Sequence, residues 1–153
     1  NPETYEDLLK ESDARGLITK EKDLWAYDGR IKGNRIAIRK SLSENQKKCV
    51  LAEELGHYYT GYGDILDQSS VSNRKQELQG RIYAYNKLIG LRGIIDAYTN
   101  HCQSLYESAQ YLDVTEEFLL ETLTYYRSKY GKYVIVDNYT IYFEPYLCVL
   151  ELT

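Results

Sequence analysis

Several features are rare or missing in this sequence of 153 residues, and their scarcity excludes some classes of protein. It has only two prolines, and we find no repeat or low-complexity tract that would indicate a linker. No apolar run approaches the roughly 20 residues that cross a bilayer, and no signal-peptide pattern is present. We therefore expect a cytoplasmic protein with no membrane contact.

Cysteines are few, and basic residues are in no excess. Cys49, Cys102 and Cys148 form an odd, widely spaced set with no C-x-x-C pair, which favours a reducing compartment over a disulfide-linked secreted scaffold. The net charge of −4 argues against a protein that wraps nucleic acid. Seventeen tyrosines against two phenylalanines indicate rings that pack with their hydroxyls at the surface.

The remaining patterns predict one α+β domain, 1–153, with a small antiparallel sheet, a helical body and a C-terminal hairpin. We divide it into segments 1–42 (a helix and strands), 43–90 (two helices), 91–131 (a helical subdomain) and 132–153 (the hairpin). Ser43 followed by Gln46 is a capping box and predicts a helix that runs to the Gly61/Gly63 region. The other expected helices are Tyr5–Arg15, Arg74–Ile89, Leu91–Asn100, Ser104–Leu112 and Glu116–Tyr130, and the expected strands are Leu24–Tyr27, Arg35–Arg39 and a hairpin over Tyr133–Phe143 that turns at Asp137-Asn138.

The most informative stretch is Glu53-Glu54-Leu-Gly-His57. It matches the zinc-protease motif H-E-x-x-H with the first histidine replaced by glutamate. Residues four apart lie above one another on a helix, so Glu53 and His57 can reach the same ion. Glu54 takes the position of the general base that activates water.

The helical wheel separates these polar residues from an apolar stripe. At about 100° per residue, Glu53, Glu54 and His57 share one arc. A solvated helix face looks the same, so this pattern alone leaves a plain surface open. The expected core stripe of this helix consists of Leu51, Leu55, Tyr58 and Tyr59.

Glu77 is the candidate third ligand. A catalytic zinc site needs three protein ligands and an open position for water. Glu77 follows His57 by twenty residues, in the next helix, and antiparallel packing of the two helices would let it face His57. The alternative is a surface glutamate paired with Arg81 one turn later.

Two segments together resemble a known family. The run Ser41–His57, followed by Glu77–Ala84 with its Tyr83-Ala84 pair, resembles the ImmA/IrrE metallopeptidases of phages and integrative elements. This resemblance implies a zincin-like core in which His57 and Glu77 are metal ligands, Glu54 is the general base and Glu53 holds the first-ligand position. It also implies a substrate, a helix-turn-helix repressor of a mobile element.

The replaced histidine changes the expected metal chemistry. A carboxylate is an acceptable zinc ligand, but a His–Glu–Glu set neutralises the ion and makes its bound water less acidic. Oxygen ligands also shift preference from zinc toward manganese or another divalent metal. The alternative function is a catalytically inactive module that keeps the fold and binds a regulator protein.

A substrate peptide needs a place to bind. An extended peptide can add to an exposed sheet edge, and the strand before the motif helix is the candidate. We therefore expect Arg35, Ala37 and Arg39 to be substrate-binding residues.

Other enzyme classes fit less well. A di-iron carboxylate site needs a second E-x-x-H, and the only other histidine, His101, has Tyr98 three residues before it. Cys49 lies about 80° and two turns from His57 on the same helix, so the two cannot form a nucleophile–base pair.

The segment Ser104–Tyr130 resembles a helix-turn-helix in outline. Its second helix opens with Glu116-Glu117, which suits the helix dipole and repels phosphate. We expect no direct nucleic-acid binding from it and predict a packing or partner-docking element instead.

Overall fold

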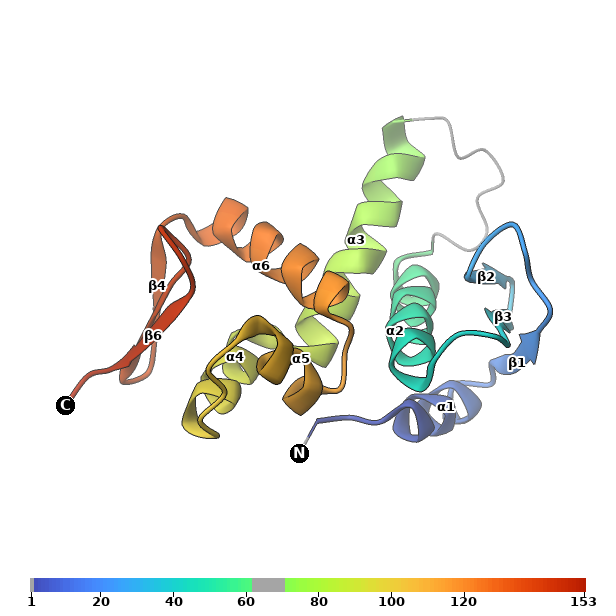
Figure 1. Ribbon diagram of the computed structural model, residues 1–153. Coiled ribbons are helices and arrows are strands. Elements are labelled where there is room, and N and C mark those ends of the chain that lie inside the picture. The colour runs from blue at the N-terminus through green and yellow to red at the C-terminus, as the bar shows by residue number, and fades with distance from the viewer. Residues whose placement is uncertain (1, 62–70) are drawn as a thin grey trace. The chain divides into compact units, whose positions relative to one another are not determined.

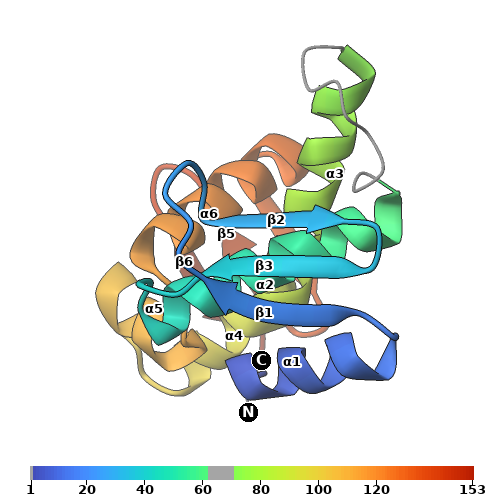
Figure 2. The ribbon, with the colours of Figure 1, turned by 90° about the vertical axis from the view of Figure 1, so that its right-hand side faces the viewer.

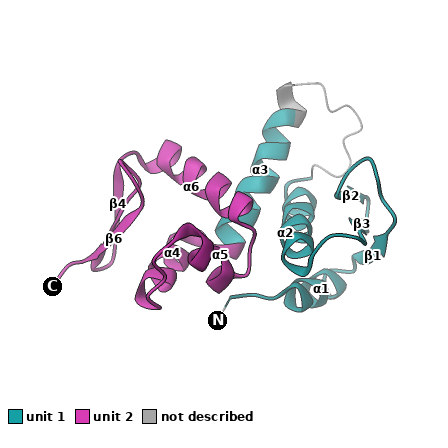
Figure 3. Cartoon of the chain, viewed as in Figure 1, with its two compact units in different colours: residues 1–87 teal, residues 88–153 magenta. Residues whose placement is uncertain are grey.

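The computed structural model describes the chain except residues 1 and 62–70, and at 71–73 it describes the backbone alone. The fold is α+β, as predicted. It divides into two compact units, Asn1–Lys87 (unit 1) and Leu88–Thr153 (unit 2), which Figure 3 colours separately. Along the chain (Figure 1) the elements are α1 Tyr5–Ala14, β1 Ile18–Lys22, β2 Gly29–Lys32, β3 Arg35–Arg39, α2 Glu44–Thr60, α3 Val71–Leu88, α4 Gly90–Thr99, α5 Leu105–Leu112, α6 Glu116–Tyr130, β4 Tyr133–Val136, β5 Tyr139–Tyr142 and β6 Cys148–Glu151.

Unit 1 is built on a three-stranded sheet in the order β1-β3-β2. β2 and β3 form an antiparallel hairpin, whereas β1 runs parallel to β3, so the sheet is mixed. α2 packs against β2 and β3, and α1 packs against β1. In Figure 2, α2 lies behind the sheet and the other sheet face points toward the viewer.

The strands of unit 1 alternate between two faces, as pleated strands must. Ile31, Ile36 and Ile38 are buried beneath the sheet. Thr19 and Glu21 point to the same side, since the Thr19 hydroxyl lies 2.5 Å from that of Ser12 and Glu21 accepts a hydrogen bond from Tyr5. The alternate residues of the three strands, which lie between these inward-facing positions, face outward.

α2 begins and ends where the sequence predicted. The Ser43 hydroxyl accepts the Gln46 backbone N–H, and the Gln46 side chain accepts the Ser43 N–H, so the capping box is formed. Gly61 ends the helix in the left-handed conformation, with φ of 79°, which glycine adopts without a steric penalty. α2 and α3 run antiparallel beside each other (Figure 1).

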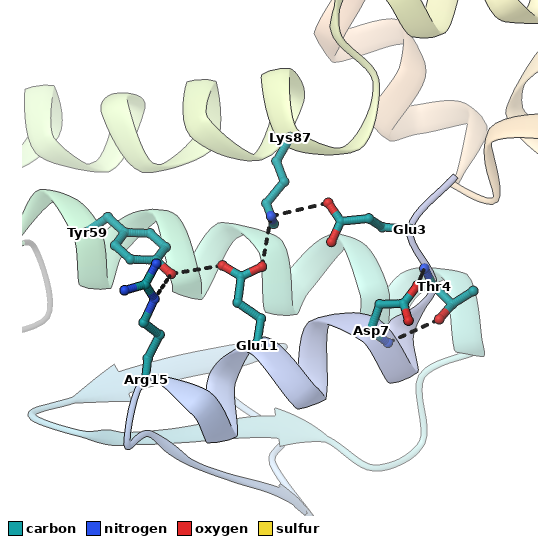
Figure 4. A network of polar contacts seen from close by, with 7 residues as sticks. All are labelled: Glu3, Thr4, Asp7, Glu11, Arg15, Tyr59 and Lys87. Carbon is teal, nitrogen blue, oxygen red and sulfur yellow. Dashed lines mark hydrogen bonds and ion pairs between the residues drawn. The ribbon is translucent and has the colours of Figure 1, made fainter. Parts of the chain in front are cut away.

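A polar network joins α1, α2 and α3 (Figure 4). Lys87 near the end of α3 pairs with Glu11 at 2.8 Å and with Glu3 at 3.2 Å. Glu11 also accepts a 2.8 Å hydrogen bond from the Tyr59 hydroxyl, which in turn accepts one from Arg15. These contacts fix the position of α3 against the motif helix.

Unit 2 contains α4, α5, α6 and the antiparallel sheet β4-β5-β6. The hairpin at Asp137-Asn138 and the caps of α5 and α6 at Ser104 and Thr115 follow the prediction. No helix in the described part of either unit has the length and apolarity that crossing a bilayer requires. The buried core of unit 2 includes Ile94, Ile95, Leu112, Phe118, Leu119, Tyr126, Ile141 and Phe143.

Several predictions about strands and core positions were wrong. Leu24–Tyr27 is not a strand but part of the β1–β2 connection, and Trp25 is 93% exposed. The actual strands β1 and β2 were missed because their charged residues hide the alternation, and β6 was missed as well. Tyr58 and Tyr59 are not core residues, since each is 37% exposed.

Candidate functional site

The candidate site lies on α2, where two ionisable side chains are buried. Glu54 and His57 are each only 7% exposed. The plain solvated surface that the helical wheel left open is therefore excluded at Glu54 and His57. This part of α2 is covered by β2 on one side and by α3 on the other, and a glycine permits each of these approaches.

Gly29 brings the start of β2 onto Glu54. A Cβ atom at position 29 would lie 3.0 Å from Glu54 Oε2 and 2.3 Å from Val50 Cγ1. The missing side chain lets the strand backbone lie directly over the Glu54 carboxyl group. Glu54 is thus placed beneath the first residue of β2.

Gly56 and Gly80 let α2 and α3 cross at close range. A Cβ at position 56 would lie 2.3 Å from the Gly80 carbonyl oxygen, and a Cβ at position 80 would lie 2.2 Å from His57 Nδ1. The imidazole ring of His57 therefore packs against the backbone of α3. Glu77 precedes Gly80 by one helical turn, so antiparallel packing brings it to this crossing.

Burial and like charges raise the pKa of Glu54 to about 8. Desolvation is the largest cause, followed by the negative charges of Glu53 and Glu77. Both carboxylates are therefore near enough to act on Glu54. In the metal-free protein at pH 7, Glu54 is mostly protonated.

The pKa of His57 is lowered to about 4. Burial disfavours the imidazolium, and the positive charge of Arg81 adds to the effect. His57 is therefore neutral at pH 7, which is the state of a histidine that binds a metal.

The predicted ligands meet the chemical requirement for a divalent metal, but they are not assembled into a site. A neutral imidazole and two carboxylates lie around Glu54, where a cation would relieve the charge repulsion. However, no three His, Cys, Asp or Glu side chains among the described residues converge to hold an ion. Glu77 is exposed, so closing the site would require its side chain to turn toward His57.

The expected edge at Arg35–Arg39 is wrong. β3 is the central strand, and its backbone is paired with β1 on one side and β2 on the other. A peptide cannot add beside it. The side chains of Arg35, Ala37 and Arg39 lie on the outward sheet face, and their contact with a substrate stays a prediction.

Sequence reasoning missed the parts that surround the ligands. Gly29 follows Asp28 as in a turn, and no local pattern showed that it would lie over Glu54. Gly80 carried no signal by itself, since its role depends on what packs against it. Arg81 was considered as a partner for Glu77, and the structure shows that its charge acts on His57.

The helix-borne Glu-x-x-His unit beneath a small sheet defines a metallopeptidase-like fold. The family model described as the IrrE N-terminal-like domain, Peptidase_M78, matches residues 11–124. The chain belongs to this family, the ImmA/IrrE metallopeptidases, whose members are generally metal-dependent. Nothing among the curated proteins matches the chain.

Proposed function

We propose that this protein is a metal-dependent endopeptidase that cleaves a helix-turn-helix repressor of a mobile element in the cytoplasm. The observation that carries this proposal is the burial of Glu54 beneath β2 and of His57 against α3, with the charges of Glu53 and Glu77 acting on Glu54. Family membership supports the reaction class. The repressor as substrate rests on the resemblance alone.

The residues around Glu54 fit general acid–base chemistry. His57, Glu53 and Glu77 would hold the metal, zinc or manganese, which supplies Lewis-acid activation of a water and of the scissile carbonyl. Neighbouring positive charge favours the ionised form of Glu54, which then takes a proton from the water. Glu54 passes this proton to the leaving amine.

The substrate would bind along β2 rather than β3. In the described chain β2 pairs only with β3, so its other edge is available for strand addition. Gly29 lies over Glu54, and a peptide paired with β2 would therefore pass next to the proposed base. This replaces the edge expected at Arg35–Arg39.

Incubation of the protein with a helix-turn-helix repressor of the mobile element that carries its gene tests the proposal. With zinc or manganese added, we expect a single cut, and Glu54→Gln should reduce its rate by about 100-fold or more while repressor binding survives. Glu44→Gln, an exposed change on the same helix, is the matched control. An uncut repressor with either metal would overturn the proposal.

A second candidate is a binding module without catalysis. It is favoured by the absence of a metal-holding group among the described residues and by the protonation of Glu54 at pH 7. In that case repressor capture should be indifferent to chelators and to Glu54→Gln.

The metal site can be tested without activity. Glu53→His restores the usual ligand set, so we expect it to tighten zinc binding by about tenfold or more in isothermal titration. Glu44→His is the control for a new histidine on the same helix. Unchanged or weaker zinc affinity after Glu53→His would place Glu53 away from the metal.

A further inference from the structure

The outward face of the β1-β3-β2 sheet is strongly basic, although the chain as a whole carries a net charge of −4. Strand alternation places every second side chain on this face. Among the outward positions of the three described strands, none is acidic. The basic side chains there are Lys20 and Lys22 on β1, Arg30 and Lys32 on β2, and Arg35 and Arg39 on β3.

Five of these cations are open to a ligand. Arg39 is paired with Asp28 at 3.3 Å. The other five, which we call the basic face (Lys20, Lys22, Arg30, Lys32 and Arg35), are exposed and form no ion pair with a described residue.

The register gathers these side chains around a small central residue. Ala37 lies opposite Lys20 on β1 and opposite Arg30 on β2. Next to this row, Arg35 lies opposite Lys32. The short Ala37 side chain leaves a hollow of about 230 Å³, and all five side chains of the basic face line it. Figure 2 looks onto this surface.

We propose that the basic face binds an acidic peptide segment in extended conformation. Carboxylates on alternate residues of such a segment repeat at about 7 Å, the spacing of Arg30 and Lys32 along β2. Among the described residues, none forms an ion pair with the five cations of the basic face, and an acidic ligand would supply that partner.

A peptide fits these observations better than a nucleic acid. Sheets that bind single strands stack bases on aromatic side chains, and the strands β1, β2 and β3 contain none. The nearby ring of Tyr27 is covered by the guanidinium of Arg30, 5.6 Å from its centroid.

The basic face and the proposed cleavage site lie on opposite sides of the same strand. β2 carries both Arg30 and, one residue earlier, Gly29 over Glu54. The acidic segment would therefore lie across β2 from the scissile bond of the substrate. This last step rests on the proposed function, whereas peptide binding does not.

Peptide binding can be measured without cleavage. The Glu54→Gln chain is titrated, in chelator, into a labelled peptide of alternating Glu and Thr about eight residues long, and anisotropy is followed. We expect binding at low salt that weakens by at least about tenfold near 0.3 M salt. A peptide of alternating Gln and Thr should bind at least about tenfold more weakly.

Charge reversal locates the surface. Arg30→Glu with Lys32→Glu, and separately Lys20→Glu with Lys22→Glu, should each weaken binding by about tenfold. The control Lys10→Glu removes an exposed charge from α1 and should change it by less than about twofold. The corresponding Gln variants carry no repulsive charge, so they should lose less peptide affinity than the Glu variants. They confirm the effect if the charge-reversed variants misfold.

Several outcomes would overturn the inference. These are equal binding of the Glu and Gln peptides, an equal loss with Lys10→Glu, or binding of oligothymidylate in place of the acidic peptide. If the acidic peptide binds but no repressor is ever cut, only the proposed function fails. If the repressor is cut while the acidic peptide does not bind, only this inference fails.

Discussion

Unit 1 and unit 2 differ in what they bury. The lysine, glutamate and histidine side chains buried in the described chain, Lys48, Glu54 and His57, all lie in unit 1. The buried polar residues of unit 2 are Thr122 and Thr140, and the Thr122 hydroxyl donates to a carbonyl of its own helix. Burying an ionisable group costs stability, so a protein retains such groups where chemistry needs them. The comparison places the candidate chemistry in unit 1.

The two units also differ in charge. Unit 1 contains 15 basic and 14 acidic residues, whereas unit 2 contains 4 basic and 9 acidic ones. The acidity of the chain is therefore a property of unit 2. The basic sheet face of unit 1 is concealed when only the total charge is considered.

Glycine packing should produce the largest contrast between the units. Gly56→Ala in unit 1 forces a Cβ against the backbone of Gly80, which cannot move aside, and should destabilise by about 3 kcal/mol or more. The matched change Gly93→Ala in unit 2 meets no atom nearer than 3.4 Å and gains helix propensity, so its effect should stay within about 1 kcal/mol. Urea unfolding measures both. Equal effects would show that the α2–α3 crossing is looser than described.

The buried carboxyl of unit 1 should give stability an unusual pH dependence. Because its folded pKa is raised from 4.5 to about 8, Glu54 favours the folded state below pH 4.5, and this contribution is lost as pH rises to about 8. His57, lowered from 6.5 to about 4, gives the opposite slope below pH 6.5. Between pH 4.5 and 6.5 the two slopes cancel. The free energy of unfolding should therefore fall by about 1.4 kcal/mol per pH unit only from pH 6.5 to 8.

Glu54→Gln should remove that fall and stabilise the metal-free protein at pH 7 by on the order of 2 kcal/mol. Urea unfolding in chelator at several pH values measures the effect. Glu117→Gln, at an exposed position of α6 in unit 2, is the control. A wild-type slope retained after Glu54→Gln would mean that another group titrates.

Ion pairs should give the smallest contrast. Burial opposes ionisation of Glu11, but hydrogen bonds from Lys87 and Tyr59 outweigh it and lower the pKa of this carboxyl. Lys87→Gln should therefore cost about 1 kcal/mol near pH 7, and its cost should vanish as pH falls below the usual range of Glu11. The exposed pair of Arg92 and Asp137 in unit 2 is the comparison, and Arg92→Gln should leave the thermal midpoint unchanged. A Lys87→Gln chain as stable as wild type would refute the role of the network.

Helices were predictable because their signals are local. Ser43, Ser104 and Thr115 cap the helices that follow them, and Gly61 ends α2. The strands of unit 1 were harder, because only one face is apolar and the other is charged. The apolar run at Leu24–Tyr27 gave a false strand, since apolar residues also occur in exposed connections.

The sequence by itself determined the ends of α2, the four-residue spacing of Glu53 and His57 and the family to which the chain belongs. The tertiary structure alone decided that Glu54 and His57 are buried and that β2, not β3, forms the sheet edge beside them. The physical reason is that protonation depends on desolvation and on nearby charges. Both arise from segments far apart in the chain, which meet only where Gly29 and Gly80 allow close contact.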